Sequence, residues 1–287
     1  MNRQVIRTLK TKPFNSVTST ISSATQPAQT KSIPITKPFG LDKPILLNHT
    51  IPEKNQYNLS SIWYNLTSVE SRAERSKKID YDIKHSALFD AKSFNNVNGK
   101  IFTPPIAYFK STYSKYFPDF IAPTLTKKNL SLYDVLEEKN ISIVNVFSTV
   151  AGQQCINSYY QVENKDLYAK DFRSFQEMYP NCQIIDINIP QSWLKGFLLN
   201  LSINNLKKMI HSSRFDKYFI LSDQIFKYEV RDSLLCSNSC SGYIYVLDKK
   251  GRIRWATSGY STEEDLKLMW KVIKGLNSEN KMGITRK

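Results

Sequence analysis

Four cysteines have the clearest capacity for chemistry in this chain: Cys155, Cys182, Cys236 and Cys240. A thiol can form a disulfide, ligate a metal or act as a redox nucleophile, and each role needs a characteristic spacing and setting. Four cysteines in 287 residues are too few for a disulfide framework, so a reducing or mixed compartment is the default expectation. No Cys-x-x-Cys pair is present.

The pair Cys236 and Cys240 has a spacing that allows a local disulfide or two metal ligands. A zinc site would need two further ligands, and His49, His85 and His211 show no paired spacing. We therefore expect no metal site and interpret the pair as incidental thiols at the entrance of a strand. The chain also lacks a P-loop, a glycine-rich dinucleotide turn and an HExxH motif. No catalytic, cofactor-binding or metal-binding residue is predicted, and an enzyme is not expected.

The composition and charge restrict the setting of the protein. Hydrophobic residues make up 41% and aromatic residues 12% of the chain, enough to bury a core, and the net charge is +15. Such a charge suits a nucleic-acid surface, an anionic membrane face or the mitochondrial matrix. Nucleic-acid binding is not expected, because a basic stripe with interleaved aromatics is missing. The longest uncharged run, residues 140–162, contains too many amides and hydroxyls for a transmembrane helix.

Residues 1–36 have the composition of a mitochondrial transit peptide and linker. Up to residue 41 the chain contains six basic residues and no acidic residue, and it is rich in Ser and Thr. On a short helix, Val5, Ile6 and Leu9 would lie on one side and the early basic residues largely on the other, which is typical of such peptides. A plain basic tail is the alternative.

Residues 37–112 are predicted to form an N-terminal extension. Helical spacing without Gly or Pro predicts a charged helix at about 67–92, which residues 95–99 end. The run 101–125 holds four prolines and seven aromatics. It is therefore not a regular helix, and its rings are expected to be buried. We predict an extended segment pinned across the surface of a domain, with peptide binding by the aromatics as the alternative.

The rest of the chain alternates strand and helix signals. Predicted strands are 141–148, 182–189, 243–248 and 252–257, and predicted helices are 166–179, 192–211 and one that begins at a Ser261–Glu264 capping box and stops at Gly275. This order predicts an α/β, thioredoxin-like three-layer domain over residues 113–276. Its mixed central sheet would have helices on both faces and end in an antiparallel hairpin. Residues 277–287 are predicted to be a basic tail.

The place where a thioredoxin-like domain carries its reactive thiols holds no such pair. That place lies between the central strand and the next helix, where the helix N-terminus lowers the pKa of a cysteine. The run Thr149–Cys155 supplies a single thiol there, and Ser239–Gly242 stand where a proline is expected before the hairpin. These two absences argue against redox catalysis. The alternative, a mitochondrial thiol oxidoreductase that uses Cys155 or the Cys236/Cys240 pair, stays open.

Two features favour partner binding instead. Helix 192–211 would place apolar residues on one side, where they could lie on a membrane surface or against an apolar partner helix. The other feature is an alternation of basic and apolar residues on a possible edge strand. The candidate partner-binding residues are Trp193, Phe197, Leu198 and Leu201 in the helix, and Arg252, Arg254 and Trp255 in the strand. In both cases packing within the domain is the alternative.

Several motifs resemble those of the fungal mitochondrial ATP synthase assembly factors, over roughly residues 37–276. They are Lys37-Pro-Phe-Gly-Leu41, Phe102-Thr-Pro-Pro105, Tyr116-Phe-Pro-Asp119, Gly242-Tyr-Ile-Tyr-Val-Leu-Asp248, and the most specific one, Gly251-Arg-Ile-Arg-Trp-Ala256 with Gly259. The resemblance implies a chaperone located peripherally at the matrix face of the inner membrane. It would bind subunit a, the proton-channel subunit, and promote its association with the ring of c subunits. The family has no catalytic residues to carry over.

Overall fold

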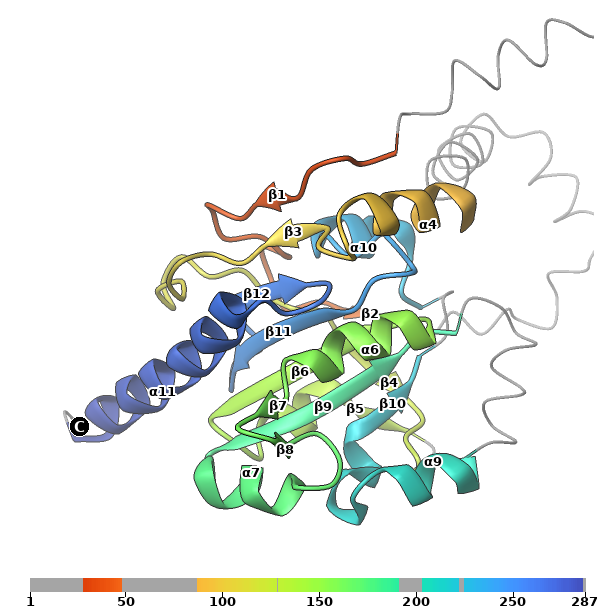
Figure 1. Cartoon of the computed structure of the whole chain (residues 1–287). Coiled ribbons are helices and arrows are strands. Elements are labelled where there is room, and N and C mark those ends of the chain that lie inside the picture. The colour runs from red at the N-terminus through yellow and green to blue at the C-terminus, as the bar shows by residue number, and fades with distance from the viewer. Residues whose placement is uncertain (1–27, 48–86, 128, 191–202, 222–224, 286–287) are drawn as a thin grey trace, which may run out of the picture.

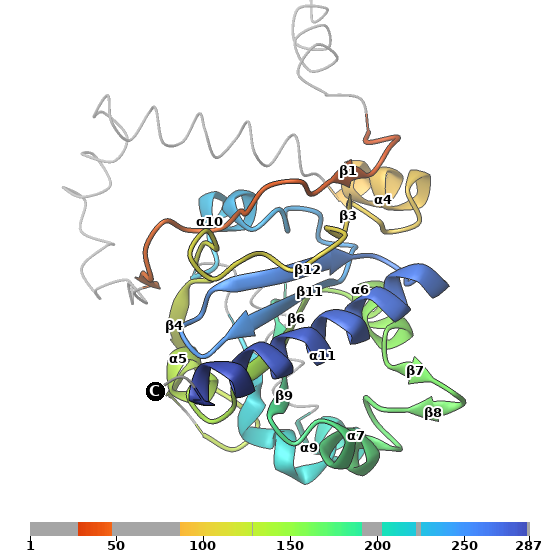
Figure 2. The ribbon, with the colours of Figure 1, turned by 90° about the vertical axis from the view of Figure 1, so that its left-hand side faces the viewer.

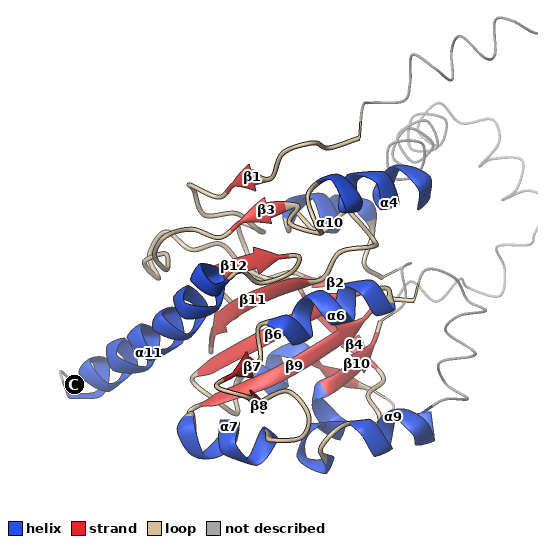
Figure 3. Cartoon of the chain, viewed as in Figure 1, coloured by secondary structure: helices blue, strands red, loops and turns tan. Residues whose placement is uncertain are grey.

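The computed structural model describes residues 28–47, 87–127, 129–190, 203–221 and 225–285. Its centre is a five-stranded sheet in the order β10-β9-β6-β11-β12 (Figure 1 and Figure 3). The strands are β6 (Ile141–Phe147), β9 (Cys182–Asn188), β10 (Tyr218–Ile220), β11 (Tyr243–Asp248) and β12 (Ile253–Ser258). β6, β9 and β10 are parallel, whereas β11 runs antiparallel to both β6 and β12. The predicted mixed sheet with a terminal hairpin is confirmed.

Strand β6 is central because both of its faces are apolar. All of its residues are buried: Val144 and Val146 belong to one hydrophobic cluster, and Ile143 and Phe147 belong to another. Alternate side chains of a strand point to opposite faces of the sheet. A nearly continuous apolar run therefore fits a strand that is covered on both sides.

Helices cover both faces of the sheet, as predicted (Figure 2). One face is packed by α6 (Val150–Ser158), α7 (Phe172–Met178) and α11 (Glu263–Thr285), which supply buried residues to a single hydrophobic cluster. The other face is packed by α5 (Leu132–Leu136), by α10 (Tyr228–Ser233) and by aromatic residues that precede α5. The elements between β9 and β10 are α9 (Ile203–Met209) and the 3-10 helix η1 (Ser212–Lys217).

The run 101–125 lies along both outer edges of the sheet. On the β12 side, Phe109 N donates a hydrogen bond to Arg254 O at 2.7 Å. On the β10 side, Ile220 N donates to Pro123 O at 3.0 Å. An uncovered edge strand invites pairing with other chains, so this segment protects the sheet. The prediction of an extended segment pinned on a domain is confirmed.

The same run contributes small strands and core aromatics. Its strands are β3 (Phe102–Thr103), which pairs with β1 (Ile33–Pro34), and β4 (Asp119–Ala122), which lies between β2 (Leu46–Leu47) and β5 (Leu130–Ser131). The rings of Phe102, Phe117 and Phe120 are at most 1% exposed. Their burial favours packing over peptide binding as the role of these aromatics.

The last helix differs from prediction at both ends. α11 continues through Gly275 to Thr285, because Gly275 has no left-handed backbone and lies against the ring of Tyr108. The predicted stop at Gly275 is therefore wrong. At the start of the helix, Asp265 N donates to Thr262 Oγ1 at 3.1 Å, so the capping pair lies one residue later than predicted.

Two other helix predictions change or fall outside the structure. α7 begins at Phe172 rather than near Asp166, because β7 (Gln161–Val162) and β8 (Lys165–Asp166) form a hairpin there. The helix predicted at about 67–92 lies mostly outside the described residues, and its described end, α4 (Ala87–Asn96), stops within the predicted 95–99. Among the described residues, no helix is both long enough and apolar enough to cross a membrane.

Candidate functional site

The site that follows β6 contains one thiol, and α6 holds it away from the helix N-terminus. Thr149 is the N-cap, and its Oγ1 accepts a hydrogen bond from Gly152 N at 3.1 Å. Cys155 is the sixth residue of α6 and is fully buried. Because a helix dipole acts mainly within the first turn, Cys155 gains little from it. Burial raises the pKa of the Cys155 thiol to about 11, so the thiol stays protonated at neutral pH.

The loop 238–242 packs directly on α6 at this site. Asn238 Oδ1 accepts hydrogen bonds from Cys240 N at 3.0 Å and from Ser241 N at 3.2 Å. A Cβ on Gly242 would overlap the carbonyl of Gly152. The loop and the helix therefore approach each other with no room for a side chain between them.

Helix α4 of the extension is bonded to the same loop. Asp90 is 1% exposed, and its Oδ2 accepts from Ser239 N at 2.8 Å and from Ser239 Oγ at 2.6 Å. Asn238 Nδ2 donates to Asp90 O at 2.9 Å, and Ser241 Oγ donates to Gly99 O at 2.6 Å. The extension is thus fixed to the loop that stands where the proline of a redox site is expected.

A partly buried cation, Lys100, lies near the thiol but does not activate it. Lys100 Nζ donates to Asp265 Oδ2 and to Tyr159 OH, both at 2.7 Å. Tyr159 OH also shares a hydrogen bond with Thr257 Oγ1 at 2.7 Å. Burial lowers the pKa of Lys100, and Asp265 opposes this effect. Lys100 does lower the pKa of Cys155, but desolvation of the thiol is the larger effect.

The other cysteines do not provide an activated thiol pair either. Burial raises the pKa of Cys182 and of Cys236 to about 12. Cys240 is partly exposed, and none of the four cysteines forms a disulfide in the structure. Within the described residues, no group of three or more His, Cys, Asp or Glu side chains could hold a metal ion.

Sequence reasoning missed a buried ion pair in the core. The side chains of Asp186 and Arg214 are 0% and 1% exposed, and Arg214 Nη2 donates to Asp186 Oδ2. Asp186 Oδ1 accepts from Asn145 Nδ2 and from Tyr168 OH, each at 2.9 Å. The sequence feature that could have revealed this pair is Asp186, because an acidic residue inside an apolar strand requires a partner. The side chains of this cluster are at most 4% exposed, so it offers no surface to a substrate.

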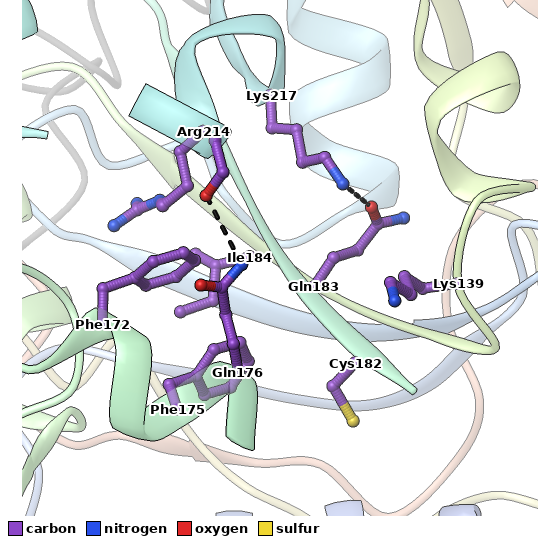
Figure 4. A pocket seen from close by; sticks show the side chains of 10 residues that line it. Lys139, Phe172, Phe175, Gln176, Cys182, Gln183, Ile184, Arg214 and Lys217 are labelled. Carbon is purple, nitrogen blue, oxygen red and sulfur yellow. Dashed lines mark hydrogen bonds between the residues drawn. The ribbon is translucent and has the colours of Figure 1, made fainter. Parts of the chain in front are cut away.

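A small pocket lies beside this pair, and the lysines that line it are bonded to other groups of the protein (Figure 4). Lys217 Nζ donates to Gln183 Oε1 at 2.6 Å and forms an ion pair with Glu138 at 2.7 Å. Lys139 Nζ donates to Pro180 O at 2.8 Å. Since both lysines in its wall already have partners, this pocket is not a candidate anion or cofactor site.

Two of the three strand candidates for partner binding, Arg254 and Trp255, lie in the interior rather than on a surface. Trp255 is 0% exposed and its Nε1 donates to Pro105 O at 3.0 Å. Arg254 is 3% exposed and pairs with Glu279 at 2.8 Å, while Arg252 is half-buried. The physical reason is that the run 101–125 covers the edge of β12. The helix candidates Trp193, Phe197, Leu198 and Leu201 lie outside the described residues.

The strand order, the helix that follows β6 and the final hairpin define a thioredoxin-like protein whose usual redox position holds one buried thiol. The sequence model of a family described as ATP10 protein matches residues 19–276. The chain therefore belongs to the ATP10 protein family, which confirms the resemblance seen in its motifs.

Fungal relatives named "Mitochondrial ATPase complex subunit ATP10" match most of the chain. The relative from Candida glabrata is 31% identical over 247 residues, which cover 85% of each chain. The relative from Eremothecium gossypii is 30% identical over 239 residues, which cover 83% of this chain and 85% of the relative. The relative from Saccharomyces cerevisiae is 28% identical over 242 residues, which cover 82% and 86%.

Similar solved structures include thiol–disulfide proteins of bacteria. A DsbF homologue from Corynebacterium diphtheriae has a TM-score of 0.37 and 14% identity, and the match covers 59% of this chain and 92% of that one. A putative thiol:disulfide interchange protein DsbE from Chlorobium tepidum has a TM-score of 0.38 and 11% identity, with 57% and 96% covered.

Proposed function

We propose that this protein is an assembly chaperone for the membrane sector of mitochondrial ATP synthase. It binds subunit a at the matrix face of the inner membrane and promotes the association of subunit a with the ring of c subunits. The observation that carries the proposal is membership of the ATP10 protein family over residues 19–276. The names of the relatives connect that family with the mitochondrial ATPase complex.

The geometry around Cys155 supports a role without thiol chemistry. Cys155 is buried in mid-helix, and its pKa of about 11 keeps it protonated. Asp90 and Gly99 of the extension are bonded to Ser239 and Ser241 of the adjoining loop. A chaperone needs a stable scaffold rather than an accessible nucleophile, and this arrangement provides one.

The proposal is tested by deleting the gene and following the enzyme complex on native gels. We expect the soluble catalytic sector to assemble while subunit a is degraded or fails to join the c ring. Co-purification from detergent-solubilised mitochondria should recover subunit a with this chain. Normal assembly of subunit a in the deletion strain would overturn the proposal.

A mitochondrial thiol oxidoreductase is the second candidate, because Cys240 is partly exposed and lies four residues from Cys236. A variant with all four cysteines replaced by Ala separates the two functions, since Ala does not bury a hydroxyl at Cys155, Cys182 or Cys236. If the protein is a chaperone, this variant is expected to rescue the deletion strain fully. Loss of rescue by a variant that still folds would favour thiol chemistry.

The client contact is proposed to involve the apolar residues of the predicted helix 192–211. They are Trp193, Phe197, Leu198 and Leu201. A photo-crosslinking amino acid at Phe197 is expected to capture newly made subunit a in mitochondria, whereas the same probe at exposed Lys170 serves as control. Equal capture from both positions would exclude this helix as the client contact.

A further inference from the structure

Exposed lysines and exposed apolar side chains lie on the turn between β11 and β12 and on the run that borders β12. We define the hairpin-end surface as Ile106, Lys110, Tyr113, Lys249 and Lys250, which are all exposed. The last two form the turn between β11 and β12, and the others belong to the run that covers the edge of β12. None of these residues has a place in the core or in the site described above.

Backbone and side-chain contacts join the two segments that carry this surface. Arg252 Nη1 donates to Ser111 O at 3.2 Å, and Phe117 N donates to Gly251 O at 2.8 Å. The chain between residues 110 and 116 therefore lies beside the turn of the hairpin. Figure 2 shows this part of the run next to the start of β12.

The charge of the surface is positive and not neutralised by the fold. Within the described part of the chain, Lys110, Lys249 and Lys250 make no ion pair. Two carboxylates at the same end already have partners. Asp42 pairs with Lys115 at 3.1 Å, and Asp248 pairs with Arg252 at 2.8 Å.

The apolar members are among the most exposed large apolar side chains of the described residues. Ile106 is 91% exposed and Tyr113 is 72% exposed. Their neighbours in the same run, Phe102 and Phe117, are at most 1% exposed. Exposed aliphatic and aromatic tips among lysines match the interface of a lipid bilayer, where rings and chains enter the headgroup region while ammonium groups meet anionic lipid.

We propose that the hairpin-end surface binds an anionic lipid bilayer. A nucleic acid would also attract the lysines, but it offers no apolar layer for Ile106, and Tyr113 is the single ring of this surface, whereas faces that hold bases stack several. The inference rests on the proposed function only for the identity of the membrane, the inner mitochondrial membrane. Vesicle binding is measured on the purified chain alone, so its failure is distinct from a failure of subunit a assembly.

The test is co-sedimentation of the full chain with vesicles of phosphatidylcholine, with and without phosphatidylglycerol. Binding is expected only with the anionic lipid and is expected to weaken at high salt, because exposed charges are screened. The variant Lys110→Ser/Lys249→Ser/Lys250→Ser should lose affinity by at least about tenfold. The variant Ile106→Ser/Tyr113→Ser should lose affinity by about tenfold while its affinity falls with salt as steeply as that of the parent chain, since the lysines are unchanged.

The matched control is Lys165→Ser/Lys170→Ser/Lys271→Ser, which removes the same charge from exposed positions elsewhere on the molecule. It should keep most of the vesicle affinity. Equal losses in the control and the hairpin-end variant would show that net charge or the basic N-terminal residues drive binding, and would overturn the proposal. Preferential binding of RNA over anionic vesicles would also overturn it. Circular dichroism and urea midpoints equal to those of the parent chain verify that each variant is folded.

Discussion

The Asp186–Arg214 pair is the clearest case in which single residues decide the stability of this protein. Both side chains are buried, and the carboxylate accepts further hydrogen bonds from Asn145 and Tyr168. A buried pair is expensive to desolvate, so its net contribution is small while it is intact. Removing one member leaves an uncompensated charge in the core, which is the costly situation.

We therefore expect Asp186→Leu to lower the free energy of unfolding by about 3–5 kcal/mol. The double variant Asp186→Leu/Arg214→Met should recover a large part of that loss, because it removes the stranded charge as well. Urea unfolding of the full chain measures both. A double variant that is as unstable as the single variant would show that the hydrogen-bond network, and not the charge, is decisive.

Because two of the thiols are buried, we expect the folded protein to lose stability in mild alkali. Burial raises the pKa of Cys182 and Cys236 from an ordinary 9.0 to about 12. Above pH 9 the unfolded chain releases these protons while the folded chain keeps them, so stability is full below that pH and falls as pH rises towards 12. The expected slope is about 1.4 kcal/mol per pH unit for each thiol. In the variant Cys182→Ala/Cys236→Ala, the free energy of unfolding should decline less steeply between about pH 9 and pH 10, before the tyrosines titrate. An unchanged slope would contradict the raised pKa values of the two thiols.

Among the elements, the contact between the extension and the end of the sheet is unusually close. Gly99 follows α4 and Gly259 follows β12, and both have left-handed backbones, with φ of 71° and 68°. A Cβ on Gly259 would overlap the backbone of Gly99 and Lys100. Glycine is therefore needed at 259 for its conformation and for the approach of the extension.

We expect Gly259→Ala to destabilise the chain by about 2–4 kcal/mol, as the sum of left-handed strain and overpacking. Asn98→Gly is the matched control, because exposed Asn98 already has a positive φ of 50° and contributes no buried side chain. That change should leave stability equal or slightly higher. Thermal unfolding monitored by circular dichroism compares the two, and a stable Gly259→Ala variant would mean that the extension can shift without cost.

At the scale of the whole molecule, the described extension and the thioredoxin-like domain share one hydrophobic core. Phe102 belongs to the same cluster as Val144 of β6 and Tyr245 of β11. The separate predicted bounds 37–112 and 113–276 remain predictions about domain organisation. The shared core implies that both parts unfold together.

Phe102→Ala is therefore expected to lower global stability by about 3–5 kcal/mol, as for a residue in the centre of a domain. Tyr113→Ala in the same run should change stability by less than about 0.5 kcal/mol, because its side chain is mostly exposed. Unfolding followed by fluorescence and by circular dichroism should give coincident curves. Separate transitions for the two probes would show that the extension is an independent unit.

Local patterns were sufficient for four of the five strands of the sheet, and β10 (Tyr218–Ile220) was not predicted. The apolar β-branched runs of β6 and β9 and the Lys-Lys-Gly turn of the hairpin predicted strands whose bounds agree with the structure to within a residue or so. The end of α11 failed because a glycine stops a helix only when its backbone turns left-handed, and packing against Tyr108 keeps Gly275 helical. The predicted start of α7 was wrong because residues 161–166 pair as the β7–β8 hairpin and Asp166 Oδ1 then accepts hydrogen bonds from Tyr168 N and Ala169 N, which holds a turn before the helix.

By itself, then, the sequence determined the fold class, the absence of a Cys-x-x-Cys pair and, through its motifs, the family. Those properties depend on short runs of residues whose types and spacing are visible in one dimension. Only the tertiary structure decided that Arg254 and Trp255 are interior, that Asp186 has a partner, and that Cys155 is buried near Lys100 without being activated. Burial and pKa depend on which distant segments cover a side chain. Here the covering segments are the run along the sheet edges and the extension fixed to loop 238–242.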